Sequence, residues 1–170
     1  MFWLTTVSGK TYRCHALIVA TGMQRRTLNV PGEKKLLRRG VSYVLSQDLP
    51  IFAGKSVAVV GGGNSALQSS LELAKNKCRV IVITPLWTAD PSLSEEARKL
   101  PDLVVLDSHE VVEIKGEDEV EGITVRNLRN GRETFYRVSG VLVAIGHSPN
   151  SFLASQLVDL NEKKEIVVNP

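Results

Sequence analysis

The chain of 170 residues suits one compact domain, or one domain with a short additional segment. Its 43% hydrophobic and 23% charged residues are ordinary for a globular protein, and no apolar run approaches the roughly 20 residues that span a bilayer. The net charge of +3 is small and comes without a nucleic-acid motif, so we expect neither a membrane nor a nucleic-acid partner. No signal peptide is visible at the start, and the expected location is therefore cytoplasmic.

The first third of the chain predicts two strands and a long connector. Residues 2–7 and 11–20 have strand-like patterns around a turn at 8–10. Residues 23–55 carry several glycines and prolines, and they predict mostly connector with one short helix over 34–38.

Basic side chains cluster in the segment EKKLLRRG. Lys34, Lys35, Arg38 and Arg39 fall at helical spacing. The simpler interpretation is a solvated helix face. The alternative is a docking surface for an acidic protein partner.

The middle of the chain predicts a βαβ unit. The apolar residues 56–60 are typical of a strand buried on both faces of a parallel sheet. Three glycines follow, then a helix over 64–75 and a second buried strand at 79–84.

The later elements change character after a third parallel strand. Ser92 and Glu95 fit a capping box for a helix over 93–100, and residues 103–107 predict the strand. Alternating patterns then predict an antiparallel meander, and an apolar strand returns near the end. These segments lie at 109–116, 119–127, 133–138 and 140–146. The predicted fold class is α/β, a Rossmann-like parallel sheet with flanking helices and an antiparallel β-meander layer.

Metal ligands are not indicated by the cysteines and histidines. Cys14 and Cys78 form no C-x-x-C pair, and their apolar neighbours predict buried free thiols. His15, His109 and His147 are widely separated.

The glycine turn matches a dinucleotide-binding fingerprint. Gly61, Gly63 and Ala66 satisfy G-x-G-x-x-G/A between a buried strand and a helix. Gly61 allows the tight turn, Gly63 lets the backbone approach a pyrophosphate, and Ala66 lets the helix pack closely. Free N–H groups near Asn64 and Ser65 favour a bound anion, with Gly62 completing the turn. A structural turn without a ligand is the alternative.

The choice between NAD and NADP stays open in the sequence. An acid at the end of the second strand binds the ribose 2′-hydroxyl, whereas basic residues accept a 2′-phosphate. Thr84 occupies that position and is followed by PLWTAD, so neither signature is present. The Thr84 hydroxyl can still hydrogen bond to a ribose hydroxyl. Trp87 fits adenine stacking, an exposed loop position or a core position.

Several segments together resemble one family. They are ALIVATG, LNVPGE, GVSY, FAGKSVAVVGGGNSALQSSLELA, VEGITVRN and GVLVAIGHSPN. They stand in the order found in low-molecular-weight thioredoxin reductases, and TADPSL is more similar to the flavoprotein subunit of alkyl hydroperoxide reductase. The chain thus resembles a pyridine nucleotide–disulfide oxidoreductase. The resemblance implies an FAD domain interrupted by an NAD(P)-binding domain, with hydride passing from nicotinamide to flavin and then to a disulfide.

The resemblance also implies a division of the chain. Residues 1–21 correspond to FAD-domain strands, 22–53 to a crossover connector, 54–147 to the NAD(P)-binding domain and 148–170 to a return segment. Ile145, Gly146 and His147 lie in the second crossover, which the resemblance puts near the nicotinamide. His147 is either a proton donor there or a turn histidine.

The chain departs from the family at the redox pair and at the flavin site. Val44 and Gln47 stand where the resemblance implies cysteines, so a dithiol relay cannot operate there. Asp48 matches the family's acid beside the second cysteine, and a helix cap or solvated turn explains it equally well. The glycine fingerprint for FAD is absent, so FAD is expected only in a longer parent chain.

Two functions follow from these observations. The first is the NAD(P)H-binding domain of a thioredoxin reductase-like, FAD-dependent oxidoreductase that lacks the C-x-x-C dithiol and is inactive by itself. Its parent would deliver electrons to an acidic acceptor protein, as cysteine-free relatives that reduce ferredoxin or flavodoxin do, and a homodimer is compatible with it. The second is a non-catalytic nucleotide-binding or regulatory module that keeps the fold without redox turnover.

Overall fold

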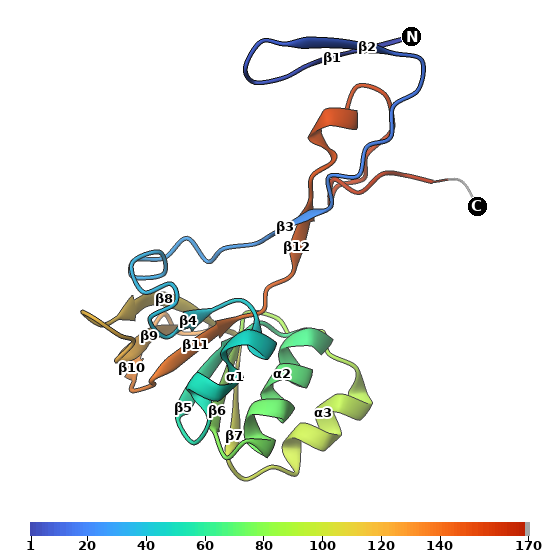
Figure 1. Ribbon diagram of the computed structural model, residues 1–170. Coiled ribbons are helices and arrows are strands. Elements are labelled where there is room, and N and C mark those ends of the chain that lie inside the picture. Colours follow the sequence, from blue (N-terminus) through green and yellow to red (C-terminus); the bar gives the residue numbers. More distant parts are fainter. Residues whose placement is uncertain (169–170) are drawn as a thin grey trace. The chain divides into compact units, whose positions relative to one another are not determined.

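The computed structural model describes residues 1–168 and divides the chain into two compact units (Figure 1). The central unit comprises Arg25–Gly146. The terminal unit comprises Met1–Gln24 together with the described part of His147–Pro170.

A five-stranded parallel sheet forms the middle layer of the central unit. Its strand order is β4-β11-β5-β6-β7, and every neighbouring pair is parallel. The strands are β4 (Val41–Ser42), β5 (Ser56–Val60), β6 (Arg79–Thr84), β7 (Leu103–Asp107) and β11 (Gly140–Val143). Because β5 lies between β11 and β6, the turn that follows β5 opens at the middle of the sheet's carboxyl edge.

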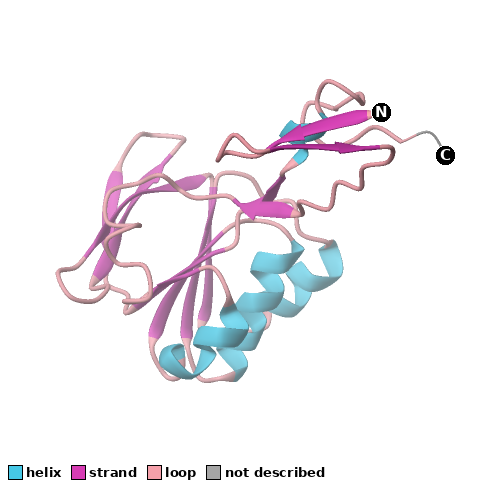
Figure 2. Cartoon of the chain, turned by 45° about the horizontal axis from the view of Figure 1, so that its top comes forward, coloured by secondary structure: helices cyan, strands magenta, loops and turns pink. Residues whose placement is uncertain are grey.

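Helices and an antiparallel sheet cover opposite faces of this parallel sheet (Figure 2). The helices are α1 (Leu45–Phe52), α2 (Asn64–Lys75) and α3 (Pro91–Arg98). The antiparallel sheet has the order β10-β9-β8 and consists of β8 (His109–Lys115), β9 (Gly122–Asn127) and β10 (Glu133–Tyr136).

Residues 57–60 of strand β5 are all apolar and buried, because the strand is covered on both faces. Val57 and Val59 belong to the core on the helix side, with Phe52, Leu67 and Leu71. Ala58 and Val60 belong to the core beneath the antiparallel sheet, with Ile123 and Val125 among the residues packed there. Successive side chains of a strand point to opposite faces, so a strand covered on both faces requires an apolar residue at every position.

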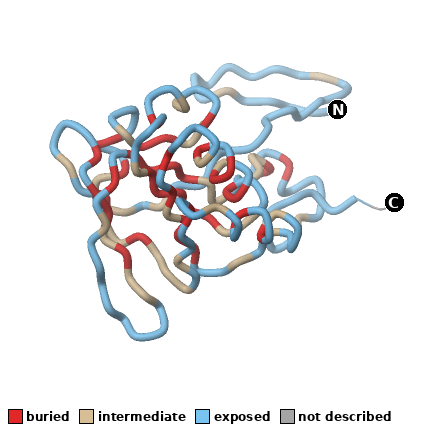
Figure 3. The backbone as a smooth tube through the Cα atoms, turned by 90° about the horizontal axis from the view of Figure 1, so that it is seen from below, coloured by how far each residue is buried: buried red, intermediate tan, exposed pale blue. Residues whose placement is uncertain are grey.

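The terminal unit is built from short strands and has little buried surface. β1 (Phe2–Thr5) and β2 (Thr11–Cys14) form an antiparallel hairpin. β3 (Met23–Arg25) pairs with β12 (His147–Pro149), and a short 3₁₀ helix, η1, follows at Ser151–Ala154. Among the described residues of this unit only Ser151 and Ala154 are buried, and most of the hairpin is exposed (Figure 3).

The predicted α/β class and most of its elements are confirmed. Strands occur at 56–60, 79–84, 103–107 and within 140–146, and the helix at 64–75 has the predicted bounds. The three later strands form the predicted antiparallel meander. Cys78 is a buried free thiol as predicted, whereas Cys14 is only half-buried because its hairpin has no covering layer among the described residues.

Three local predictions are wrong. The second strand ends at Cys14 instead of residue 20, because no described strand pairs with the apolar residues that follow. Residues 34–38 form turns and an isolated bridge and not a helix, and Arg38 adopts a positive φ angle that a right-handed helix does not contain. The capping box at Ser92 and Glu95 does not form, since α3 begins earlier, at Pro91, a residue whose fixed φ suits a first helical position.

Two elements of the central unit were not predicted. Helix α1 contains Pro50, a residue that favours a connector in the sequence, but Pro50 is the sixth residue of an eight-residue helix that Leu45 and Phe52 anchor in the core. Strand β4 is only two residues long, too short for a periodic signal. No described helix has the length and apolar character needed to cross a membrane.

Candidate functional site

The candidate site is the glycine turn between β5 and α2. Gly61 adopts φ +142°, and a Cβ there would overlap the carbonyl oxygen of Ala144. A Cβ on Gly62 would overlap the carbonyl oxygen of Leu86 and the hydroxyl of Thr84. The surrounding protein therefore accounts for both glycines.

Gly63 differs from the two glycines before it. Its φ of −95° and ψ of 178° are open to any residue. The nearest atom to an added Cβ is the Thr88 Oγ1 at 3.6 Å, an ordinary contact distance. Neither backbone strain nor the packing of the described residues demands a glycine here. A ligand that approaches this backbone closely would demand one.

The amino end of α2 is suited to an anion. Gly63 is the N-cap residue and supplies no side-chain cap, and the first helical turn carries no acidic residue. Asn64 and Ser65 are exposed. The first N–H groups of a helix lack partners within the helix, and the helix dipole adds positive potential at this end. Ala66 is 1% exposed and lies in the core between the helices and the sheet.

The loop after β6 folds back over the glycine turn. The Thr88 N–H donates to the Gly62 carbonyl oxygen at 2.8 Å. The Asn64 side-chain amide donates to the Asp90 carboxylate at 2.7 Å, and its oxygen accepts the Asp90 N–H at 2.8 Å. Residues 26 positions apart are therefore joined at the edge of the turn.

Thr84 is buried at the end of β6. Its hydroxyl donates to the Leu86 carbonyl oxygen at 2.6 Å and accepts the Leu86 N–H at 3.2 Å. The hydroxyl hydrogen is thus used to close the 84–86 turn. Trp87 packs against the helix-side core and donates from Nε1 to the Ser94 hydroxyl at 3.0 Å, which agrees with the core interpretation of this residue.

Residues 144–146 lie beside the glycine turn. The Ala144 N–H donates to the Val60 carbonyl oxygen at 2.8 Å, and the Ala144 carbonyl lies against Gly61. Ile145 packs on the core beneath the antiparallel sheet. Gly146 adopts φ +86° with no atom within 4 Å of an added Cβ. The fold thus brings two predicted site segments, 61–66 and 145–146, to one edge of the sheet.

The segment at 42–48 begins helix α1. Val44 is the N-cap residue, and its N–H donates to the Ser42 hydroxyl at 3.0 Å. Gln47 is exposed. Asp48 lies in the first turn of α1, where its negative charge interacts favourably with the helix dipole. Asp48 is therefore neither the cap of α1 nor part of a turn, the two positions that the sequence offered beside the acid of the family's motif.

Tyr43 joins this segment to a buried acid. Its hydroxyl donates to Glu33 at 2.6 Å, and the same carboxylate accepts the N–H groups of Leu28 and Asn29, each at 2.8 Å. Burial raises the pKa of the Tyr43 phenol above its ordinary value, and the hydrogen bond and negative charge of Glu33 raise it further.

An acidic loop lies beside the basic cluster. The four basic residues at 34–39 are exposed on turns, not on a helix face. Lys35 Nζ donates to the Gly116 carbonyl oxygen at 3.1 Å, and the Val120 N–H donates to the Arg39 carbonyl oxygen at 2.9 Å. These contacts hold the acid-rich residues 117–121 next to the cluster, where they reduce its net positive charge.

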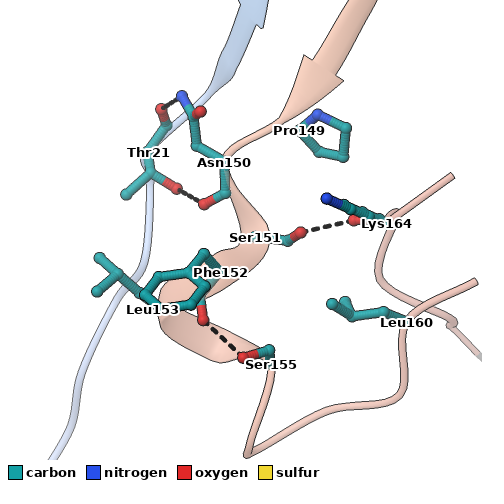
Figure 4. A pocket seen from close by; sticks show the side chains of 9 residues that line it. All are labelled: Thr21, Pro149, Asn150, Ser151, Phe152, Leu153, Ser155, Leu160 and Lys164. Carbon is teal, nitrogen blue, oxygen red and sulfur yellow. Dashed lines mark hydrogen bonds between the residues drawn. The ribbon is translucent and has the colours of Figure 1, made fainter.

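A cavity of about 420 Å³ occurs within the terminal unit (Figure 4). Thr21 and Asn150 form its polar edge, because the Thr21 hydroxyl donates to the Asn150 carbonyl oxygen and the Asn150 amide donates back to Thr21. Phe152 and Leu153 line another side and are largely exposed. Among the described residues, no group of three or more His, Cys, Asp or Glu side chains could hold a metal ion.

The sheet order, the succession of β5, glycine turn and α2, and the covering meander define the Rossmann-like α/β class. A family model described as pyridine nucleotide-disulphide oxidoreductase matches residues 3–170. The chain therefore belongs to the pyridine nucleotide-disulphide oxidoreductase family, and the resemblance to thioredoxin reductases is confirmed.

Curated relatives extend well beyond this chain. The bifunctional thioredoxin reductase/thioredoxin of Mycobacterium leprae is 36% identical over 97% of the chain and 36% of the relative. The F subunit of alkyl hydroperoxide reductase from Staphylococcus aureus is 34% identical over 98% of the chain and 33% of the relative. An NADH dehydrogenase of Bacillus subtilis is 35% identical over 99% of the chain and 34% of the relative. The chain thus spans about a third of the length of these relatives.

Solved structures of thioredoxin reductases have a similar fold and also extend beyond this chain. Thioredoxin reductase from Lactococcus lactis has a TM-score of 0.83 and 26% identity over 94% of this chain and 54% of that one. Thioredoxin reductase from T. acidophilum has a TM-score of 0.82 and 29% identity over 94% of this chain and 53% of that one. The chain spans about half the length of each.

Proposed function

We propose that this chain is the NAD(P)H-binding part of an FAD-dependent oxidoreductase, and that the glycine turn holds the nucleotide pyrophosphate. Gly63 is the observation that carries the proposal. It is the one glycine of the turn that neither its backbone angles nor its described neighbours require, and it caps a helix end without a side-chain cap. Both features fit a phosphate group seated on the backbone.

The residues present suit the parts of a dinucleotide in order. The N–H groups at Asn64 and Ser65 would hold the pyrophosphate, with Gly61, Gly62 and Ala66 shaping the turn beneath it. Thr84 would lie near the adenosine ribose, and Ile145 and Gly146 would lie near the nicotinamide. Bound NAD(P)H supplies a hydride. This chain's residues would bind and orient the nucleotide.

The terminal unit supports the proposal of a longer flavoprotein. Trp3, Ile18 and Phe152 are 67%, 90% and 84% exposed. A unit with so few buried residues cannot offset the entropy of ordering its own chain. We therefore assign residues 1–21 and 148–170 to an FAD domain completed elsewhere, 22–53 to the connector and 54–147 to the NAD(P)-binding domain. No residue of this chain is assigned to the flavin itself.

The route of electrons beyond the flavin is a further part of the proposal. The chain contains two cysteines, Cys14 and Cys78, and Val44 and Gln47 occupy the segment of the family's dithiol. We therefore expect an acceptor other than a dithiol of this segment. Contact with an acidic acceptor protein at the basic cluster remains a prediction, as do a homodimer and a cytoplasmic location.

Calorimetric titration of the chain with NADH and with NADPH tests nucleotide binding. We expect at least one to bind, and we expect Gly63→Ala to weaken that binding at least tenfold while lowering the free energy of unfolding by no more than about 1 kcal/mol. Gln68→Ala, on the exposed side of the same helix, is the matched control and should change neither. Unchanged affinity in Gly63→Ala would contradict the assignment of the turn.

A second candidate function is a nucleotide-binding or regulatory module without turnover. It is favoured by the internal use of the Thr84 hydroxyl and by the two positions without thiols. The two functions differ in the full-length parent. Bound FAD whose absorbance NAD(P)H bleaches supports the oxidoreductase, whereas a parent that never binds flavin supports the module.

A further inference from the structure

We infer that Asp90 makes the proposed nucleotide site selective for NADH over NADPH. The inference rests on the proposed function and adds the identity of the nucleotide. The sequence alone left this choice open, because Thr84 at the end of β6 carries no charge. The folded chain supplies an acid from a different position.

Asp90 is held at the glycine turn by two hydrogen bonds to one side chain. Asn64 directly follows Gly63, and its amide donates to the Asp90 carboxylate at 2.7 Å. The Asn64 oxygen accepts the Asp90 N–H at 2.8 Å. Together these bonds fix both the backbone and the carboxylate of Asp90 beside the first residue of α2.

The Asp90 carboxylate does not cap the helix that it precedes. Asp90 is the N-cap residue of α3, and an N-cap aspartate ordinarily accepts an N–H of its own helix. Here it makes no side-chain cap, and Asn64 takes one carboxylate oxygen instead. Its second oxygen forms no hydrogen bond with any described residue, and it is available to accept a ribose hydroxyl.

Positive charge is sparse near Asp90 along the chain. No lysine or arginine occurs between residues 84 and 92. Arg98 lies at the other end of α3, about 12 Å along the helix axis. No described lysine, arginine or histidine forms an ion pair with Asp90.

Arg129 is a cation whose ion-pair partner lies opposite the end of β6. It forms an ion pair with Asp107 at 3.4 Å, and Asp107 lies opposite Thr84 in the β6–β7 register. Its guanidinium also donates to the Ser108 hydroxyl. The Asp107 charge offsets that of Arg129, so the pair gives little net attraction for a phosphate.

The consequence for the two nucleotides follows from charge. In a fold of this class the adenosine ribose lies between the glycine turn and the end of the second strand. NADH presents a 2′-hydroxyl there, which can donate to the unused Asp90 oxygen. NADPH presents an additional phosphate of nearly two negative charges, which the Asp90 carboxylate repels. Repulsion between Asp90 and the pyrophosphate is common to both nucleotides and leaves the ratio of their affinities unchanged.

Titration of the chain with NADH and NADPH at two salt concentrations tests the inference. We expect NADH to bind at least tenfold more tightly at low salt, and the ratio to narrow as salt screens the repulsion. Asp90→Asn should reduce the ratio at least threefold, chiefly by improving NADPH binding. Asp48→Asn removes an acid from the first turn of α1 and should leave the ratio unchanged.

Each outcome bears on one of the two proposals. Binding of neither nucleotide to the folded chain would overturn the proposed function and the inference with it. Binding of both with NADPH equal or tighter would overturn the inference alone, and so would an unchanged ratio in Asp90→Asn. Loss of NADPH binding in Arg129→Ser would show that Arg129 attracts the 2′-phosphate, and it would contradict the statement that Asp107 offsets its charge. If Asp90→Asn does not fold, the ratio in the unmodified chain and its salt dependence still decide the matter.

Discussion

Replacing Glu33 by glutamine should destabilise the central unit, although the change keeps the size of the side chain. Glu33 is 1% exposed. One carboxylate oxygen accepts the Leu28 N–H and the Tyr43 hydroxyl, and the other accepts the Asn29 N–H. The acid thus satisfies three donors from two segments of the connector.

The magnitude follows from these three bonds. A hydrogen bond to a charged acceptor contributes about 1.5–3 kcal/mol to the free energy of unfolding, and a buried donor without a partner costs about 1–3 kcal/mol. Glutamine replaces one oxygen by an NH₂ group, which removes the bond to the Asn29 N–H and sets two donors against each other. The expected loss for Glu33→Gln is about 2–4 kcal/mol. Tyr43→Phe removes one bond from a half-buried group, and we expect a loss of about 1–2 kcal/mol.

Urea unfolding followed by Trp87 fluorescence measures these losses. Trp87 is half-buried and lies in the same unit as Glu33. Trp3, in the terminal unit, would be replaced by phenylalanine in all variants so that one fluorophore reports. A loss below about 0.5 kcal/mol for Glu33→Gln, the range of neutral surface changes, would refute the account of this carboxylate.

Three further predictions concern pH, thiols and the glycine turn. The raised pKa of Tyr43 keeps the folded phenol protonated above about pH 10, where the unfolded phenol ionises, so the free energy of unfolding should fall as pH rises beyond that value. Urea unfolding of Tyr43→Phe across this range should show a shallower fall, and an equal fall would contradict the assignment of this pH dependence to Tyr43. A thiol reagent should modify Cys14 readily but Cys78 only on unfolding, since Cys78 is 1% exposed and its Sγ donates to the Phe52 carbonyl oxygen; equal labelling rates would be evidence against this burial. Gly62→Ala should lower the melting temperature clearly more than Gly63→Ala, because its Cβ would overlap Leu86 and Thr84; equal melting temperatures would count against the close contact of these two residues with Gly62.

The sequence by itself determined the elements whose signals are local. The strand Ser56–Val60 is almost entirely apolar and the helix Asn64–Lys75 repeats its apolar residues at helical spacing, so both were predicted with their observed bounds. The ordered motifs also identified the family. Backbone preference and side-chain period act within a few residues, and a sequence displays them directly.

Pairings between distant segments were decided only by the tertiary structure. Gly62 must be glycine because Leu86 and Thr84 lie against it, and Asp90 reaches the turn only because the loop after β6 folds back to Asn64. The reverse case is the apolar stretch after Cys14, which carries a strand pattern but has no described strand beside it. Hydrogen bonds between segments far apart in the chain depend on where the whole fold puts their partners, and no local pattern records that position.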